Sequence, residues 1–248
     1  MGTSNDSIRD SVSRFVDRAL AERHHESLGG GQIASFHYRG LDYDNYLRLL
    51  TAMGQEAMRS RGQRSRFIID EHNHDVIRQM WLWIVGSKEC QWDLHRGIYL
   101  GGKIGCGKTI LMHAFCDVLS LVSRKYITRI AAKDLYDYLR QNGQKSLSRC
   151  PLFIDELGRE SVEVSDFGNR VRPFVDIMEQ RYETGALTLI TSNFMISTLS
   201  KEVDESGRRQ QGYGEYICER VQETTNMVVL PGGSRRQMWN NDAKGGRR

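Results

Sequence analysis

The fold is decided by the stretch Gly102-Lys103-Ile104-Gly105-Cys106-Gly107-Lys108-Thr109. It matches the pattern G-x-x-x-x-G-K-[ST], in which glycines let the backbone close around a polyphosphate. An apolar run at 98–100 precedes the stretch and a mostly apolar run at 110–115 follows it, which predicts a strand before it and a helix after it. Backbone N–H groups and a positive helix N-terminus would then point at the same anion. A glycine-rich turn that matches by chance is the alternative.

This stretch predicts a site for ATP and Mg²⁺. Lys108 is expected to reach the β- and γ-phosphates, and Thr109 to offer its hydroxyl to the metal ion. The residues expected to contact the nucleotide here are Gly102, Lys103, Ile104, Gly105, Cys106, Gly107, Lys108, Thr109 and Ile110.

Length and composition indicate an ordinary soluble protein with one main domain. The 248 residues are 39% hydrophobic and 27% charged, with a mean hydropathy of −0.53. The longest strongly apolar run, 80–85, is far shorter than a membrane span, and the polar N-terminus lacks the core of a signal peptide, so we expect a cytoplasmic protein without a membrane partner. Five cysteines without a C-x-x-C pair argue against a disulfide framework or a zinc site. The net charge of +4 permits nucleic-acid binding without requiring it.

Residues 1–66 are expected to form a helical extension, with helices near 5–26 and 42–61 and three glycines at 29–31 between them. The first helix either docks on its own domain or is tethered for a partner. Four arginines at 59–66 either touch phosphates or form a solvated helix end. His72 and His74 have no nearby third ligand to complete a metal site, so we expect them at the surface.

From residue 96 onward strand and helix patterns alternate, which is typical of a parallel α/β sheet. The predicted strands lie near 97–101, 126–130, 151–155, 187–191 and 226–230. The predicted helices lie near 108–122, 132–141, 169–184 and 213–223. The expected fold class is therefore α/β, a P-loop NTPase with a five-stranded parallel sheet flanked by helices. We expect the core at 67–237 and a basic flexible tail at 238–248.

The apolar run 151–154 ends in two acids, Asp155 and Glu156. At the carboxyl end of a parallel strand beside the P-loop, Asp155 is expected to hold Mg²⁺ and Glu156 to polarise the water that attacks the γ-phosphate. A strand that ends in acids because turns are polar is the alternative. An adjacent water-activating carboxylate favours an ATPase over a nucleotide kinase, because hydrolysis would waste a kinase's donor.

The next apolar strand ends in Thr191-Ser192-Asn193. Asn193 at its tip is expected to hydrogen-bond the γ-phosphate or the attacking water. Taken alone, a strand that ends in Ser-Asn is a common turn signal. It gains weight because this is the strand after the acidic one.

Together these motifs resemble the AAA+ ATPases of the DnaC/IstB group, which comprises helicase loaders and the ATPase helpers of insertion-sequence transposases. The resemblance covers residues 67–237 and rests on the order and spacing of Gly102 to Thr109, Leu152-Phe153-Ile154-Asp155-Glu156-Leu157-Gly158, Arg181-Tyr182-Glu183, Leu189-Ile190-Thr191-Ser192-Asn193, Tyr213-Gly214-Glu215, Arg220 and Gly233-Ser234-Arg235-Arg236.

The resemblance assigns further roles. Lys108 and Thr109 match the Walker A pair, Asp155 and Glu156 the Walker B pair, and Asn193 the sensor 1 position. Arg220 resembles the arginine finger that completes a neighbouring subunit's site, with a local salt bridge as the alternative. Arg236 matches a Ser-x-Arg ending that lies near nucleotide, although Arg235 beside it leaves that assignment open.

The resemblance implies an oligomeric ATPase that acts on single- or double-stranded DNA, with a replicative helicase or a transposase as its client. A helicase loader and a transposition helper both remain open, because the segment before the core resembles no partner-binding domain. The polar loop 208–212 either contacts DNA or is merely solvated. A P-loop phosphotransferase for small molecules and a DNA-binding module that does not hydrolyse nucleotide are the rival readings.

Overall fold

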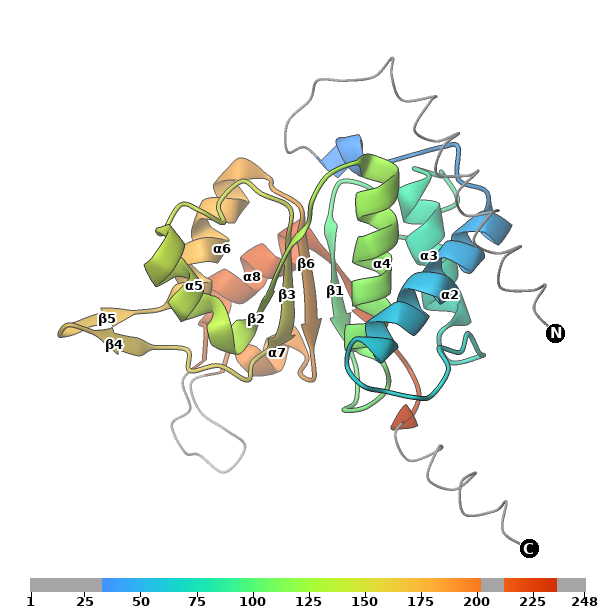
Figure 1. Cartoon of the computed structure of the whole chain (residues 1–248). Helices are drawn as coiled ribbons and strands as arrows, with labels where there is room; N and C mark the ends of the chain where they lie inside the picture. The colour runs from blue at the N-terminus through green and yellow to red at the C-terminus, as the bar shows by residue number, and fades with distance from the viewer. Residues whose placement is uncertain (1–32, 202–211, 236–248) are drawn as a thin grey trace, which may run out of the picture. The chain divides into compact units, whose positions relative to one another are not determined.

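The computed structural model describes residues 33–201 and 212–235 (Figure 1). The predicted helix at 5–26, Arg208–Gln211, Arg236 and the basic tail lie outside these residues. The described chain forms two compact units, one of residues 33–94 with 110–126 and one of 95–109, 127–201 and 212–235. The predicted division at residues 66 and 237 stays a prediction.

The second unit is built on a five-stranded sheet in which every neighbouring pair is parallel. Its strand order is β2-β3-β6-β1-β7. The strands are β1 (Gly97–Gly101), β2 (Thr128–Ala131), β3 (Leu152–Leu157), β6 (Thr188–Ser192) and β7 (Thr225–Val229). Every residue of β1 and β6 is buried, which is the pattern of inner strands in a parallel sheet. All five predicted strands are present within two residues of their predicted ends.

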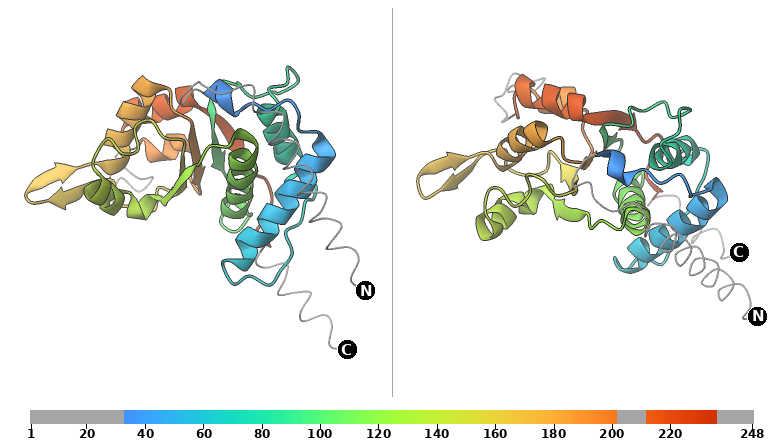
Figure 2. Two further views of the ribbon diagram at one scale, coloured as in Figure 1. Left: turned by 45° about the horizontal axis from the view of Figure 1, so that its top comes forward. Right: turned by 90° about the horizontal axis from the view of Figure 1, so that it is seen from above.

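Helices α5 (Leu135–Asn142), α6 (Pro173–Thr184) and α8 (Glu215–Thr224) lie on the same side of this sheet (Figure 1). Their apolar side chains share one core with the strands, including Leu139, Ile177 and Val221. The short helix α7 (Ile196–Leu199) follows β6, and α8 runs directly into the edge strand β7. Figure 2 shows α6 and α8 side by side.

One predicted boundary is wrong. The helix predicted at 169–184 begins only at Pro173, because residues 169–171 form a strand instead. This strand, β5 (Asn169–Val171), pairs antiparallel with β4 (Val164–Asp166) in a hairpin that projects from the second unit (Figure 1). Pro173 suits the first position of a helix, where its missing N–H has no partner to lose. The helix predicted at 132–141 likewise starts as a 3₁₀ turn, η3 (Ala132–Asp134), before α5.

The first unit packs α2 (Tyr43–Arg59), α3 (His74–Ile84) and the residues of α4 (Lys108–Ser123) from Ile110 onward. Asp42 caps α2 by accepting a hydrogen bond from the Asn45 N–H at 2.8 Å. Trp83 is fully buried and meets Phe115 edge-on at 6.2 Å between ring centroids. His37, after the 3₁₀ turn η2 (Ile33–Phe36), bonds the Trp83 carbonyl at 2.8 Å. These contacts give the first unit a core of its own.

Within the described residues, no helix has the length and apolar character needed to cross a bilayer.

Candidate functional site

The phosphate loop turns from β1 into α4 in a backbone path that requires glycine. Gly105 has φ +82° and Gly107 has φ +103°, values at which other residues are strained. A Cβ atom at Gly105 would also lie 2.4 Å from the Ser234 hydroxyl. Helix α4 then begins at Lys108. The loop therefore has the local geometry in which backbone N–H groups cradle an anion.

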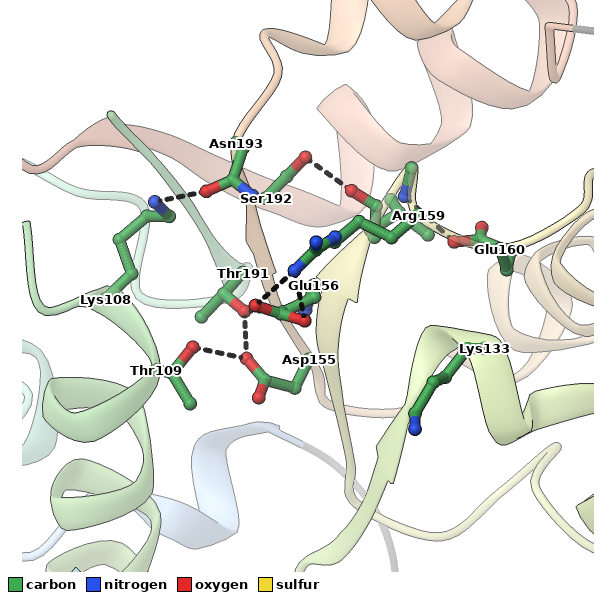
Figure 3. A network of polar contacts seen from close by, with 12 residues as sticks. Lys108, Thr109, Lys133, Asp155, Glu156, Arg159, Glu160, Thr191, Ser192 and Asn193 are labelled. Atoms are coloured by element: carbon green, nitrogen blue, oxygen red, sulfur yellow. Dashed lines mark hydrogen bonds and ion pairs between the residues drawn. The ribbon is translucent and has the colours of Figure 1, made fainter. Parts of the chain in front are cut away.

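Lys108 follows the loop directly as the first residue of α4 and is 6% exposed. Its ammonium donates to the carbonyls of Gly102 at 2.7 Å and Lys103 at 2.9 Å, and to Asn193 Oδ1 at 2.8 Å. Burial lowers the pKa of Lys108, while Cys106 and the carboxylates of Glu156 and Asp155 act in the opposite direction. An ammonium has three protons, so a phosphate oxygen would take the place of one of these acceptors. Figure 3 shows Lys108 reaching Asn193 across from the loop.

The carboxyl ends of the parallel strands bring the phosphate loop and the acidic strand end together. The Thr109 hydroxyl donates to Asp155 Oδ1 at 2.9 Å, and the Thr191 hydroxyl donates to the same oxygen (Figure 3). A hydroxyl and a carboxylate at this distance are the oxygen ligands that Mg²⁺ prefers. The chemistry of these two residues therefore fits the predicted metal ion.

A β-bulge shapes the acidic pair. Ile154 pairs with Ile190 and Leu157 with Ser192, so Asp155 and Glu156 together face the single residue Thr191. Glu156 takes the left-handed backbone conformation, with φ +60°. In a regular strand consecutive side chains point to opposite faces, whereas a bulge redirects them. Thr191 holds the bulge, because its hydroxyl oxygen accepts the Glu156 N–H at 3.0 Å while its proton goes to Asp155.

The Glu156 carboxylate forms an ion pair with Arg159. Arg159 Nη1 donates to the two carboxylate oxygens at 3.1 and 3.0 Å. The two side chains are 58% and 45% exposed, so this pair contributes little to stability. The expected base Glu156 thus has a cationic neighbour, Arg159, that sequence reasoning did not identify.

The Leu-Gly ending of the acidic motif has a steric cause. Gly158 has φ +92°, and a Cβ atom there would lie 2.8 Å from the side chains of Phe194 and Leu199. The Tyr99 hydroxyl donates to the Phe194 carbonyl at 2.8 Å, and burial raises the pKa of Tyr99 to about 12. The loops after β3 and β6 are therefore packed tightly against each other.

Arg235 lies at the phosphate loop. Its backbone N–H donates to the Gly105 carbonyl at 2.9 Å, and its Nε donates to the Cys106 carbonyl at 3.0 Å. Arg236 lies outside the described residues, so its predicted role stays a prediction. These contacts place the Arg235 side chain on the loop.

The remaining predicted residues are spread more widely. Ile104 is 71% exposed on the loop, and Ile110 follows Thr109 in α4. Arg220 does not join the group around Lys108 and Asp155. Its guanidinium lies over the rings of Tyr182, at 4.5 Å, and Tyr216, at 4.0 Å. Within the described residues it has no ion-pair partner, so the local salt bridge considered as an alternative is not what holds it.

Sequence reasoning missed Thr191 and Arg159 as parts of the site. The Thr191-Ser192-Asn193 motif contains Thr191, but its role depends on the strand register. Arg159 follows the acidic motif within a turn, and an arginine in a turn carries no signal of its own. His72 and His74 belong to no group of metal-ligating residues in the described chain.

The chain is similar to several solved structures at low sequence identity. No family model and no curated protein matches the chain. Among solved structures it is similar to DnaI, with 21% identity and a TM-score of 0.49 over 68% of this chain and 87% of that one. It is also similar to the DnaC helicase loader, with 17% identity and a TM-score of 0.48 over 68% of this chain and 95% of that one. AMPPCP-bound DnaA from Aquifex aeolicus matches at 16% identity and a TM-score of 0.46, over 72% and 53%.

The fold follows from the order of this chain's own strands. One strand, β6, lies between the phosphate-loop strand β1 and the acidic strand β3. The loop and Asn193 follow the carboxyl ends of β1 and β6, and the acidic pair lies near the carboxyl end of β3. Ligands bind at these ends in open parallel sheets. The chain is therefore an α/β protein with a P-loop fold, and the expected five-stranded parallel sheet is confirmed.

Proposed function

We propose that the chain binds and hydrolyses Mg²⁺·ATP as an oligomeric switch on DNA, in the role of a DnaC-type replicative helicase loader. The observation that supports this most is the meeting of three motifs at one sheet edge. Lys108 contacts Asn193 at 2.8 Å, and Thr109 contacts Asp155 at 2.9 Å. Few arrangements other than a nucleotide site bring a buried lysine, a P-loop threonine and an acidic strand end together.

Each residue has a distinct part in the proposed reaction. Lys108 and the loop N–H groups hold the phosphates, and Thr109 and Asp155 hold Mg²⁺, which supplies charge neutralisation at the phosphoryl oxygens. Glu156 takes the proton from the attacking water as a general base. Asn193 already contacts Lys108, and from there it orients the γ-phosphate or the water.

The acidic pair favours hydrolysis over transfer to a small acceptor. Glu156 directly follows Asp155 in the bulge, so a carboxylate is available beside the metal-binding group. A phosphotransferase gains nothing from a base that activates water at this position. Release of one phosphate into solution per ADP formed would agree with hydrolysis, whereas phosphate appearing on an added acceptor would favour a phosphotransferase.

Oligomerisation and DNA binding are part of the same proposal. Arg220 from one copy would neutralise charge at the γ-phosphate of the next copy, which couples hydrolysis to assembly. Lysine and arginine contacts to phosphates would make DNA binding dependent on salt and largely independent of sequence. An IstB-like transposition helper is the second candidate, since the motifs quoted for the resemblance are common to both branches.

The first test is the ATPase rate of the full chain with and without single- and double-stranded DNA. Substituting Glu156→Gln keeps the shape of the side chain and removes its basicity, so we expect nucleotide binding to persist and kcat to fall about a hundredfold or more. Lys108→Ala removes the phosphate contact, and we expect it to abolish binding of a fluorescent ATP analogue.

Matched surface changes serve as controls. Glu179→Gln and Lys145→Ala alter exposed residues of the same types and are expected to leave the rate unchanged. Normal hydrolysis by the Glu156→Gln variant would show that the base is another residue. Turnover that ignores DNA, in a protein that stays monomeric with ATP, would contradict the switch. Binding assays with a purified replicative helicase and a transposase then separate the two clients.

A further inference from the structure

Two tyrosines from different helices enclose the candidate arginine finger. Tyr216 and Arg220 are one helical turn apart on α8, and Tyr182 comes from the last turn of α6. The Arg220 Cζ atom lies 4.0 Å from the Tyr216 ring centroid and 4.5 Å from that of Tyr182. Both distances are well within the range of attraction between a cation and an aromatic ring.

Contact with an aromatic ring need not use the hydrogen-bond donors of an arginine. A guanidinium stacks through its flat face, while its N–H donors lie in its plane and point outward. The Arg220 side chain is also without an ion-pair partner in the part of the chain that the structure describes. The two rings therefore lie against the guanidinium, and no ion pair engages it within the described residues.

The cluster lies at the surface. Tyr216 is 54% exposed and Tyr182 is 40% exposed. Tyrosine and arginine are enriched among the residues that dominate binding at protein interfaces. A second copy of this chain is the partner that this surface fits, because its bound nucleotide offers an oxyanion for bidentate recognition by a preordered guanidinium.

Tyr182 also has an acidic neighbour on α8. The Glu223 carboxylate raises the pKa of Tyr182, chiefly through hydrogen bonding to its hydroxyl. Glu223 and Arg220 both lie on α8, so this tyrosine of α6 has neighbours of both charges on the same helix.

We propose that Tyr182 and Tyr216 are positioning residues that hold Arg220 in place for the ATP site of a neighbouring copy. The proposal rests on the proposed function, since it requires Arg220 to act in trans. A flexible arginine loses considerable side-chain freedom when it binds an anion, and two stacked rings would remove much of that freedom in advance. Tyr182 and Tyr216 would thus form a clamp on Arg220. This clamp would raise kcat without changing the affinity of a copy for its own nucleotide.

The test measures kcat, KM and nucleotide affinity for DNA-stimulated hydrolysis by the full chain. Tyr216→Leu and Tyr182→Leu each remove an aromatic face, and we expect kcat to fall about two- to fivefold for each, with KM and affinity unchanged. Tyr216→Phe and Tyr182→Phe keep the ring, and each is expected to retain most of the wild-type kcat. Tyr126→Leu, at a tyrosine that is 80% exposed, is the matched control.

The same tyrosine changes are then made in a chain that carries Arg220→Ala. If the rings act through Arg220, they have no further effect on kcat in that background. A further fall there, or a failure of phenylalanine to restore the rate, would mean that the tyrosines support the fold rather than the finger. Melting curves for every variant show directly whether the fold is affected.

The role of Arg220 and the role of the two tyrosines are tested separately by these variants. If Arg220→Ala abolishes stimulation and both leucine variants are as active as wild type, the finger stands and the clamp is wrong. If Arg220→Ala itself leaves the stimulated rate unchanged, the finger assignment is wrong and the clamp falls with it. In that second case the Glu156→Gln result still reports independently on hydrolysis.

Discussion

One hydroxyl group organises both carboxylates of the candidate site. Thr191 is 1% exposed, and its oxygen bonds the Glu156 N–H while its proton goes to Asp155. Thr191→Val keeps the shape of the side chain and leaves both partners without this bond. We expect a loss of about 1–3 kcal/mol in the free energy of unfolding, measured by denaturant titration, together with a lower kcat.

Thr191→Ser is the control for this prediction, because it retains the hydroxyl. We expect it to keep most of the activity. Equal losses in the serine and valine variants would indicate that the methyl group, and hence packing, is what matters at this position.

Residues at strand ends were predictable, whereas the connections between them were not. Asp155, Glu156 and Asn193 each follow an apolar run, and parallel strands bring their carboxyl ends to one edge. Regular alternation would have sent Asp155 and Glu156 to opposite faces. The bulge that changes this depends on the register between β3 and β6, which nothing in either strand's own sequence specifies.

At the level of elements, the turn of the hairpin β4–β5 contains a residue that is unfavourable in its backbone conformation. Its two turn residues, Phe167 and Gly168, have φ +46° and +87°, the conformation that favours Asn-Gly. Phe167 is 89% exposed and lies near Arg140, 5.5 Å from its ring centroid to the guanidinium carbon. We expect Phe167→Asn to stabilise the fold by about 0.5–1 kcal/mol, because relief of left-handed strain exceeds the loss of this exposed contact.

Thermal melting checks this expectation. Phe167→Leu loses the ring contact and keeps the strain, so it is expected to melt at or slightly below the wild-type temperature. A lower melting temperature for the asparagine variant than for the leucine variant would contradict the account of the turn.

The elements themselves were largely predictable from periodicity and composition. Five strands and the helices between them appear where the apolar runs placed them. The hairpin was missed because its strands are three residues each, too short for an alternating pattern to stand out from a loop. The same omission extended the predicted helix back to residue 169, four residues before Pro173 begins α6.

For the whole molecule, the proposed assembly predicts complementation between two inactive chains. Lys108→Ala copies have no working nucleotide site but keep Arg220, and Arg220→Ala copies have the reverse defect. When the two are mixed with ATP and DNA, we expect the hydrolysis rate to exceed that of either alone, because some sites then receive an intact finger.

Each variant measured alone, at the same total protein concentration, is the control. Rates that simply average those of the two variants would argue that Arg220 acts within its own copy or not at all. The sequence predicts that copies interact, but it holds no direct signal for how many, because ring size depends on the angle between neighbouring surfaces.

The backbone at Glu156 has a consequence for laboratory evolution. A left-handed glutamate costs on the order of 1–3 kcal/mol, which glycine or asparagine at the same position would largely avoid. A population of variants selected only for resistance to heat would therefore drift away from glutamate at 156 and lose the proposed base. Selection for heat resistance and selection for turnover would therefore favour different residues at position 156.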